Sequence, residues 1–387
     1  MRLTKDSSYI EADTPILTRK GWKPIKNISK GTVIYNSRGH FTKVIHIEKA
    51  KQPFINYRVN FSDNNYIEGN SHLQFLAQNN YERQERYDAY YNHKEVINEA
   101  KIKEQLTSLP YYKFLTNETY QHYIDIEAKN FVKLYYLWET QRYDDYDSIF
   151  HWCPSIIPDP FTGRNIKIHP YLLGVWLSNG YRKDIIFRTR KKYILDKLKN
   201  LGYQPVHVKR NSVYRINKIK HHFRNLKLFE QKHIPDSYKY NTLENRWALL
   251  DGIRDGIGKK TTQQTKINLV DPVIYKDLCE LLYTMNIKIT KSSFTPAPVG
   301  SIVFKKRYSA TFQYPSLEEL LDREKYYLRQ NIRRWTKVVS IKKSKQTNKF
   351  YGIVVSSADH AFLTGYSLIP TKDNYLKIDR RTISARK

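Results

Sequence analysis

The chain has 387 residues but only two cysteines, Cys153 and Cys279. Two cysteines so far apart cannot form a zinc-finger array or the disulfide framework of a small secreted domain, so we expect a reducing compartment. No apolar run approaches the roughly 18 residues of a membrane span, and the start, MRLTKDSSYIEAD, has no signal-peptide core. The sequence therefore predicts a soluble, intracellular protein with no membrane partner, and a nuclear one if the host is a eukaryote.

Acidic residues are also few. The chain has 37 Asp plus Glu against 67 Lys plus Arg, which gives a formal charge of +30. A surplus of this size repels itself unless a polyanion is near, so with the 32 tyrosines it favours a nucleic-acid partner over a merely solvated basic surface. Ribosomal and chromatin proteins are basic too, but they are usually shorter and poorer in aromatic residues. The hydrophobic share of 40% allows sizeable cores in two or three domains.

Two kinds of pattern alternate along the chain. Residues 1–80 and 336–374 read as short strands and turns, which predicts an all-β domain made from both ends of the sequence. Residues 81–165 are dense in Tyr, Arg, Glu and His without a clear period, and we interpret them as an insertion and possible DNA-recognition region. Residues 166–335 alternate between helices and strands. A basic tail, 375–387, ends the chain.

The α/β region contains an internal repeat. Its two units, about 166–235 and 236–335, each read as helix, strand, helix, strand, strand, helix. Such duplication predicts a monomer with an internal pseudo-twofold axis. The first helix of each unit has a glycine at the equivalent place, Gly174 or Gly252. Because an interior glycine costs about 1 kcal/mol of helix stability, we expect these two helices to pack through their glycines with both C-terminal ends at one spot.

The two glycine-bearing segments resemble the motifs of the LAGLIDADG homing endonucleases. They read LLGVWLSNG over 172–180 and LDGIRDGIG over 250–258. The resemblance implies that the two helices join the halves of a DNA-cleaving domain, and that the eighth motif position is an acid which binds Mg²⁺. Paired carboxylates and helix-end carbonyls suit two metal ions that stabilise the attacking and leaving oxygens of a phosphodiester. Two core helices of an unrelated α/β protein are the alternative.

The acids that this resemblance requires are missing. Asn179 and Ile257 hold the two metal-site positions. An amide oxygen carries no charge and isoleucine cannot bind a metal ion. Asp255 is the nearest acid, but it lies about 200° around an ideal helix from position 257, so it takes over only if the helix end is distorted. We therefore keep Asn179, Ile257 and Asp255 as candidate catalytic residues of an impaired Mg²⁺ site, with Asn179 and Asp255 as its candidate ligands.

The flanking β segments resemble a Hint domain, the fold of inteins. EADTPILTRKGWKPIKNI looks like its opening, YIEGNSHLQFLA like its histidine block with His72, and KFYGIVVSSADHAFLTGYSLIPTKDN like its closing blocks with His360 and Asn374. The order of motifs is that of an intein with an inserted endonuclease, and it is most similar to the yeast type. The implied fold is α+β: an all-β Hint domain interrupted by a pseudo-twofold duplicated LAGLIDADG αββαββα domain.

The splicing chemistry of such a domain also looks lost. Tyr9 stands at the position of the first nucleophile, and Asp373 replaces the histidine that assists cyclisation of Asn374. Tyr375, which follows, is no usual acyl acceptor. A lone His72 is compatible with a core role as well. We interpret the chain as a free-standing protein that retains a splicing fold without splicing.

The strand pairs of each unit alternate basic or amide residues with apolar ones, so one face packs on helices and the other points outward. Such ribbons can read double-stranded DNA in the major groove. The candidate DNA-binding residues are Lys209, Arg210, Arg215, Asn217, Lys288, Lys291, Lys305, Lys306 and Arg307. Two hypotheses stay open: a Mg²⁺-dependent site-specific endonuclease with impaired cleavage, or a non-cleaving DNA- or RNA-binding remnant or splicing cofactor on the same scaffold.

Overall fold

The chain divides into two compact units in a computed structural model. Unit 1 comprises residues 1–159 and 324–387, and unit 2 comprises residues 160–323. The structure describes residues 3, 7–51, 56–70, 72–77, 113–116, 152–154, 156, 158–181, 183–209, 212–257, 259–260, 264–296, 307–314, 335–344 and 349–374. Within these residues no helix is both long and apolar enough to cross a membrane.

Unit 1 is built from antiparallel strands. A sheet of ten has the order β10-β18-β6-β7-β1-β19-β5-β4-β2-β3, and a sheet of four has the order β20-β21-β8-β9. The strands are β1 (Ile10–Glu11), β2 (Pro15–Thr18), β3 (Gly21–Pro24), β4 (Val33–Tyr35), β5 (Phe41–Lys49), β6 (Asn56–Phe61), β7 (Tyr66–Asn70), β8 (Gln74–Ala77), β9 (Lys113–Thr116), β10 (Trp152–Pro154), β18 (Trp335–Ser344), β19 (Phe350–Val355), β20 (Ala361–Thr364) and β21 (Ile369–Lys372), with the 3-10 turn η1 (Ile25–Asn27).

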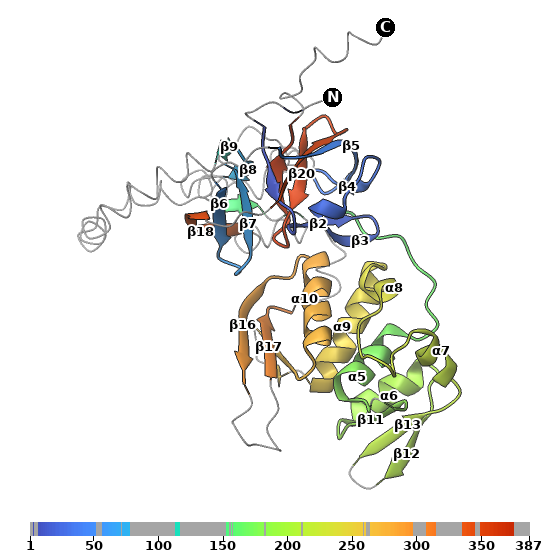
Figure 1. The fold of residues 1–387 in the computed structure, drawn as a ribbon. Coiled ribbons are helices and arrows are strands. Elements are labelled where there is room, and N and C mark those ends of the chain that lie inside the picture. The colour runs from blue at the N-terminus through green and yellow to red at the C-terminus, as the bar shows by residue number, and fades with distance from the viewer. Residues whose placement is uncertain are drawn as a thin grey trace, which may run out of the picture. The chain divides into compact units, whose positions relative to one another are not determined.

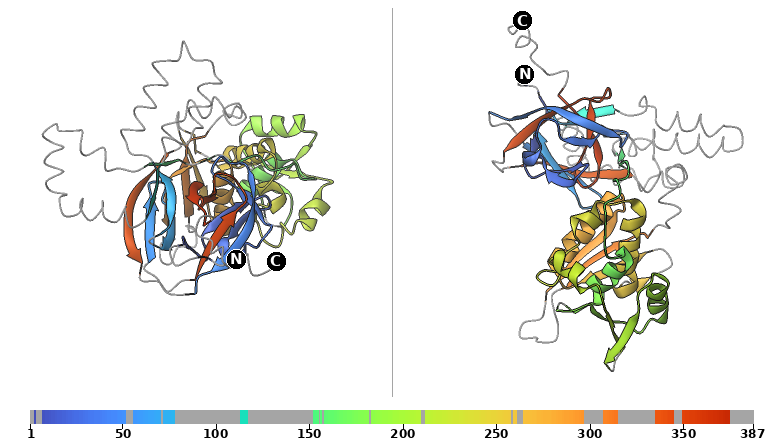
Figure 2. Two further views of the ribbon diagram at one scale, coloured as in Figure 1. Left: turned by 90° about the horizontal axis from the view of Figure 1, so that it is seen from above. Right: turned by 90° about the vertical axis from the view of Figure 1, so that its right-hand side faces the viewer.

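Both ends of the sequence share this unit, as the blue and red strands of Figure 2 show. Ile10 on β1 pairs with Gly69 on one side and with Tyr351 on the other. Apolar residues from both ends, such as Ile16 and Ile353, lie in one core. The chain is thus mixed helix and sheet with a large antiparallel sheet, and strands form at both ends, where the sequence predicts them.

The described strands of the expected insertion belong to unit 1. Strand β9 pairs with β8, and β10 pairs with β18. Otherwise most of residues 81–151 lie outside the described residues, as do the basic tail and residues 316–328, where the sequence predicts a last helix. The sequence places the borders of the α/β region at 166 and 335, whereas unit 2 runs from 160 to 323.

Unit 2 contains two sheets and the helices around them (Figure 1). The sheets have the orders β11-β13-β12 and β14-β15-β17-β16. Its elements are α5 (Pro170–Asn179), β11 (Ile186–Arg188), α6 (Lys192–Asn200), β12 (Pro205–Lys209), β13 (Val213–Ile216), α7 (Lys220–Asn225), α8 (Asp236–Lys239), α9 (Leu243–Ile257), β14 (Lys259–Lys260), β15 (Thr265–Leu269), α10 (Pro272–Thr284), β16 (Ile289–Thr295) and β17 (Arg307–Phe312). Helices and strands follow one another as the repeat predicts, except that α8 and the short β14 are additional and the predicted last helix lies outside the described residues.

The elements of unit 2 follow from local sequence. Pro170, a residue type favoured at the first helical position, begins α5, and Gly180 ends it. Residues 170–177 of α5 are all buried, which agrees with the unbroken apolar run in their sequence. The start of α9 is capped by Thr242 and not by the neighbouring Asn241. Thr242 immediately precedes the helix, and its Oγ1 accepts the backbone N–H of Asn245 at 3.4 Å.

Candidate functional site

Helices α5 and α9 pack against each other through Gly174 and Gly252. A Cβ on Gly174 would lie inside contact distance of the Leu249 carbonyl oxygen and 2.8 Å from the backbone nitrogen of Ile253. A Cβ on Gly252 would in turn collide with the carbonyl oxygen of Tyr171 and lie 3.1 Å from Cα of Gly174. Each glycine thus faces the backbone of the other helix in the same way, as the sequence predicts.

The C-terminal ends of the two helices meet as a result. A Cβ on Gly256 would collide with the Ser178 side chain. The Asn179 side chain crosses to the other helix, where its Nδ2 donates to the Gly256 carbonyl oxygen at 2.8 Å. Ile257 is partly buried and packs against the core. The two expected metal-site positions are therefore neighbours, but one presents an amide N–H and the other an alkyl group.

Two lysines cover the carbonyl oxygens at these helix ends. Lys232 Nζ donates to the carbonyl oxygens of Trp176 at 3.1 Å and Gly180 at 2.7 Å, with Leu177 O at 3.4 Å. Its ammonium also lies 4.4 Å from the centre of the Trp176 ring. Lys191 Nζ donates to the Asp255 carbonyl oxygen at 2.5 Å, on α9. Each helix end, which carries about half a negative charge, therefore has its own cation.

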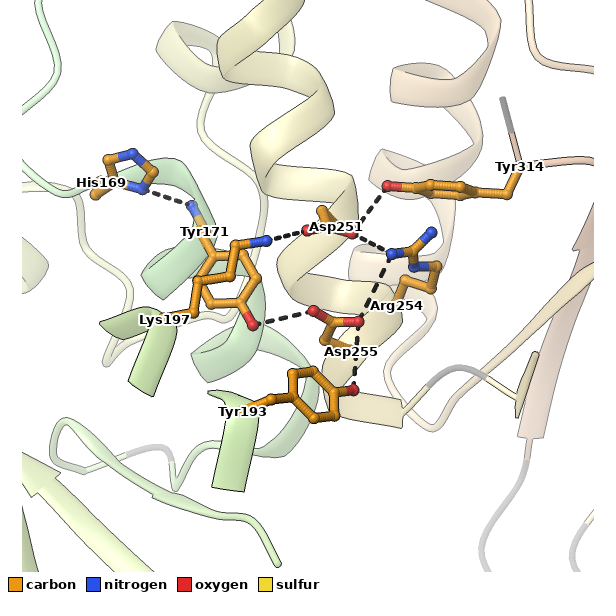
Figure 3. Close-up of polar contacts among 8 residues, drawn as sticks. All are labelled: His169, Tyr171, Tyr193, Lys197, Asp251, Arg254, Asp255 and Tyr314. Atoms are coloured by element: carbon orange, nitrogen blue, oxygen red, sulfur yellow. Dashed lines mark hydrogen bonds and ion pairs between the residues drawn. The ribbon is translucent and has the colours of Figure 1, made fainter. Parts of the chain in front are cut away.

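The Asp255 carboxylate lies between two phenols (Figure 3). Tyr171 Oη donates to its Oδ2 at 3.0 Å, and Tyr193 Oη to its Oδ1 at 3.4 Å. Arg254 Nη2 lies 3.7 Å from Oδ1. Asp255 is 3% exposed, so its carboxylate makes these contacts inside the protein.

One turn earlier, Asp251 forms the second part of this network (Figure 3). It is 2% exposed and forms ion pairs with Lys197 and Arg254. Tyr314 Oη donates to its Oδ1 at 3.1 Å. Burial and the two carboxylates raise the pKa values of Tyr171, Tyr193 and Tyr314, so all three phenols stay protonated donors. The acids of α9 thus join the two halves of unit 2.

The residues at the helix ends do not fit a divalent metal ion. Mg²⁺ requires oxygen ligands, usually with carboxylates among them. Here N–H donors from Asn179, Lys191 and Lys232 already bind carbonyl oxygens at the helix ends. The carboxylates of Asp251 and Asp255 are paired with Lys197 and Tyr171. Among the described residues, no group of three or more His, Cys, Asp or Glu could hold a metal ion.

His169 caps the N-terminus of α5, where its Nδ1 accepts the backbone N–H of Tyr171 at 3.2 Å. Burial, with the charge of Lys197, lowers the pKa of His169 below its ordinary value. Protonation would remove the acceptor, so the stability from this cap is present above the unfolded pKa of about 6.5 and is lost as the pH falls through the lowered pKa of the folded state.

We therefore expect acid to destabilise unit 2 partly through His169. Between about pH 7 and pH 5, the wild type should lose up to about 1 kcal/mol more unfolding free energy than His169→Asn, whose amide caps without titrating. Urea unfolding at both pH values measures the difference. Equal pH dependence in the two proteins would show that His169 stays neutral or that its cap is dispensable.

The second sheet has an outward polar face. Ile267, Ala310 and Phe312 pack in the core. The alternate positions form cross-strand rows on the other face: Lys266 and Lys291 pair with Thr311, Asn268 and Ser293 with Ser309, and Thr295 with Arg307. Ser309 Oγ is 2.6 Å from Asn268 Oδ1. Of the candidate DNA-binding residues, Lys291 and Arg307 lie exposed on this face.

The other candidates are distributed differently. Arg215 on β13 lies beside exposed Val206, and its Nε is 3.4 Å from Asp184 Oδ2, so it already has an acidic partner. Asn217 is exposed just after β13, and Lys288 is half-buried before β16. Lys209 ends β12, and its side chain lies outside the described part. Arg210, Lys305 and Lys306 lie outside the described residues.

In unit 1, the side-chain amide of Asn374 binds the backbone of Ser8. Its Oδ1 accepts the Ser8 N–H at 2.7 Å, and its Nδ2 donates to the Ser8 carbonyl at 2.8 Å. The Asn70 side chain binds the two residues on either side of Ser8 in the same way. Its Oδ1 accepts the Tyr9 N–H at 3.0 Å, and its Nδ2 donates to the Ser7 carbonyl at 2.8 Å. The segment thus lies between two amides, and the Tyr9 phenol, at the position where the sequence predicts a lost nucleophile, is buried.

The two histidines of the expected Hint site contact different residues: His72 contacts Ser8, and His360 lies near Asp373. The His72 carbonyl accepts the Ser8 hydroxyl at 2.6 Å, so His72 is next to the Ser8 segment. His360 has a left-handed backbone, φ 48°, and its Nδ1 is 3.7 Å from Asp373 Oδ2. That oxygen also accepts the Val355 N–H at 2.8 Å. The Asp373 carboxylate therefore binds the backbone at the end of β19.

Sequence reasoning missed the lysines and phenols of the helix-end site. Lys191 and Lys232 come from loops, and nothing in their neighbours distinguishes them from the other basic residues of the chain. A usable signal was the position of Lys232 in the connection between the two repeat units, because this connection has to pass near the helix pair that joins them. Tyr171 is one helix turn before Gly174, on the same face of α5, so its position in the sequence could have indicated a contact with α9.

No protein-family model and no curated protein matches the chain. Solved structures to which it is similar include inteins and a homing endonuclease. The MchDnaB-1 intein is 24% identical over 18% of this chain and 52% of its own, with a TM-score of 0.17. The Msm DnaB1 intein splicing domain, solved with zinc, is 26% identical over 17% and 53%, also with a TM-score of 0.17. The chain thus spans about half the length of these inteins.

The homing endonuclease among these structures is I-DmoI. A variant solved with its target DNA in the presence of manganese is 13% identical over 42% of this chain and 91% of its own, with a TM-score of 0.26. I-DmoI solved with DNA and calcium is 13% identical over 40% and 84%, with a TM-score of 0.25.

Proposed function

We propose that the protein binds double-stranded DNA site-specifically, on the plan of an intein-derived LAGLIDADG homing endonuclease, and that its cleavage activity is impaired. The contact between Gly174 and Gly252 supports this plan. Each glycine faces the carbonyl oxygen of the residue three positions before the glycine of the other helix. The matching strand orders β11-β13-β12 and β15-β17-β16 on the two sides support a duplicated, pseudo-twofold monomer. The unit 1 strands drawn from both chain ends agree with an interrupted Hint domain.

The observation that carries DNA binding is the charge of the strands. None of the described strands of unit 2 contains an aspartate or glutamate, whereas helices α6, α8, α9 and α10 all do. The outward face of the second sheet combines the cations Lys266, Lys291 and Arg307 with Asn268. Cations neutralise phosphates, while arginine and asparagine have the geometry to read guanine and adenine in the major groove.

The test is binding to a randomised duplex library, followed by salt titration on the enriched sequence. Affinity should fall with a log–log slope of roughly −0.9 for each phosphate contacted. Arg307→Ala should weaken binding by about 1–3 kcal/mol and relax one position of the site if it reads a base. Lys291→Ala should reduce the salt slope by about one contact if it meets phosphate.

Lys276→Ala is the matched control, because Lys276 is exposed on α10, which packs against the opposite face of the sheet. It should change neither affinity nor slope. An unaltered salt response in the first two variants would refute this surface. Tighter binding of single-stranded RNA than of any duplex would favour the alternative, an RNA-binding remnant or splicing cofactor.

Impaired cleavage rests on the helix ends. Asn179 donates an N–H where a metal ligand would be needed, and Ile257 offers no ligand. A supercoiled plasmid carrying the enriched site should therefore stay intact with Mg²⁺, and efficient EDTA-sensitive cutting would contradict the proposal.

A further inference from the structure

The donor set at the ends of α5 and α9 is opposite in kind to that of a metal site. A metal site needs unengaged oxygens and negative charge. Here the carbonyl oxygens of Trp176 and Gly180 accept from Lys232, that of Asp255 accepts from Lys191, and that of Gly256 accepts from Asn179. In each of these contacts the donor is a side-chain nitrogen.

We propose that the ammonium groups of Lys191 and Lys232 serve as built-in cations at the joined helix ends, so that unit 2 holds these ends together without a divalent ion and cannot bind one there while Lys232 is in place. The inference deepens the proposed function, since it names what stands in the impaired site.

Charge and geometry support this assignment. The C-terminus of a helix carries about half a negative charge, and two such ends side by side repel each other unless a cation lies between or beside them. With Asn179 and Ile257 both neutral, no carboxylate offsets a dication there. Lys232 is fixed by two hydrogen bonds under 3.2 Å and by the Trp176 ring, which makes it a placed group and not a solvated surface lysine. A metal ion would have to displace it and the Asn179 amide.

The test needs no DNA. Melting of the full chain is followed with EDTA and with millimolar Mg²⁺, and Mn²⁺ binding is measured by titration calorimetry. The variants are Lys232→Met, which keeps the length of the side chain but removes its charge, Asn179→Asp, and the two combined. Lys276→Met on the exposed side of α10 is the control for loss of a lysine charge.

We expect the wild type to melt at the same temperature in Mg²⁺ and EDTA. Lys232→Met should melt several degrees lower in both, and Lys276→Met should not. Asn179→Asp alone should bind Mn²⁺ weakly. Combined with Lys232→Met, it should bind Mn²⁺ at least tenfold more tightly than the single variant, and Mn²⁺ should raise its melting temperature.

Equal Mn²⁺ affinity of Asn179→Asp with and without Lys232 would overturn the proposal. If the combined variant does not fold, the wild type still decides: Mn²⁺ binding that disappears in Asn179→Ala would mean that a metal reaches the helix ends despite Lys232. A failure of duplex binding leaves these results untouched, so the two proposals fail separately.

Discussion

Gly174→Ala is expected to destabilise unit 2 by about 3 kcal/mol, the upper part of the usual range for overpacking a core. The added methyl group would collide with backbone, the Leu249 carbonyl, which cannot rotate away as a side chain can. About 1 kcal/mol of better helix propensity offsets only part of this cost. Gly252→Ala should behave alike, because it meets the Tyr171 carbonyl.

Urea unfolding followed by far-ultraviolet circular dichroism measures this effect, since the described α-helices all lie in unit 2. Gly163→Ala is the matched control. Its Cβ would lie 3.4 Å from Thr242 Cγ2, an ordinary contact, so stability should hardly change. Wild-type stability in Gly174→Ala would mean that the helices do not touch at this point.

Lys239→Met is expected to cost about 3–5 kcal/mol, the usual result of removing one partner from a buried ion cluster. Lys239 on α8 is 7% exposed, and its Nζ is 2.8 Å from Asp277 Oδ1 and 3.0 Å from Glu280 Oε2 on α10. Burial opposes its charge, but the hydrogen bond and charge of Asp277 prevail and raise the pKa of Lys239. Without the ammonium, two carboxylates lie close together with no cation between them.

Lys239→Met combined with Asp277→Asn should recover part of the loss, because the charge left behind is halved and the Asn oxygen can still accept the Ile234 N–H. The same urea assay applies, with Lys276→Met as the exposed control on α10. A double variant no more stable than Lys239→Met would show that the cost comes from packing and not from unpaired charge.

The helix pair and the succession of helices and strands along unit 2 could be read from the sequence because they depend on local pattern. An apolar run after Pro170 and a glycine in mid-helix already predict a buried helix in close backbone contact. The partners of individual polar groups could not be read in this way. Asp184 as the partner of Arg215, and Asp251 as that of Lys197, depend on how far long side chains reach across the folded unit.

The helix-end site shows the same limit. The motif positions of Asn179 and Ile257 were readable, and so was the loss of their acids. The replacement was not, since Lys232 lies far along the chain from the carbonyls it contacts. Similarly, Thr242 and Asn241 are both good caps by composition, and only the path of the chain before α9 decides between them.

The position of β1 between β7 and β19 constrains how the protein is made on the ribosome. Strand β19 is synthesised after all of unit 2, so the first strands emerge with one edge of their sheet unpaired. Unit 2 consists of one continuous segment and can fold as soon as it has emerged, which brings the distant ends of unit 1 closer together and shortens the loop that has to close. We therefore expect unit 2 to become resistant to protease on stalled nascent chains before unit 1 does, and chains truncated before β19 to depend on chaperones.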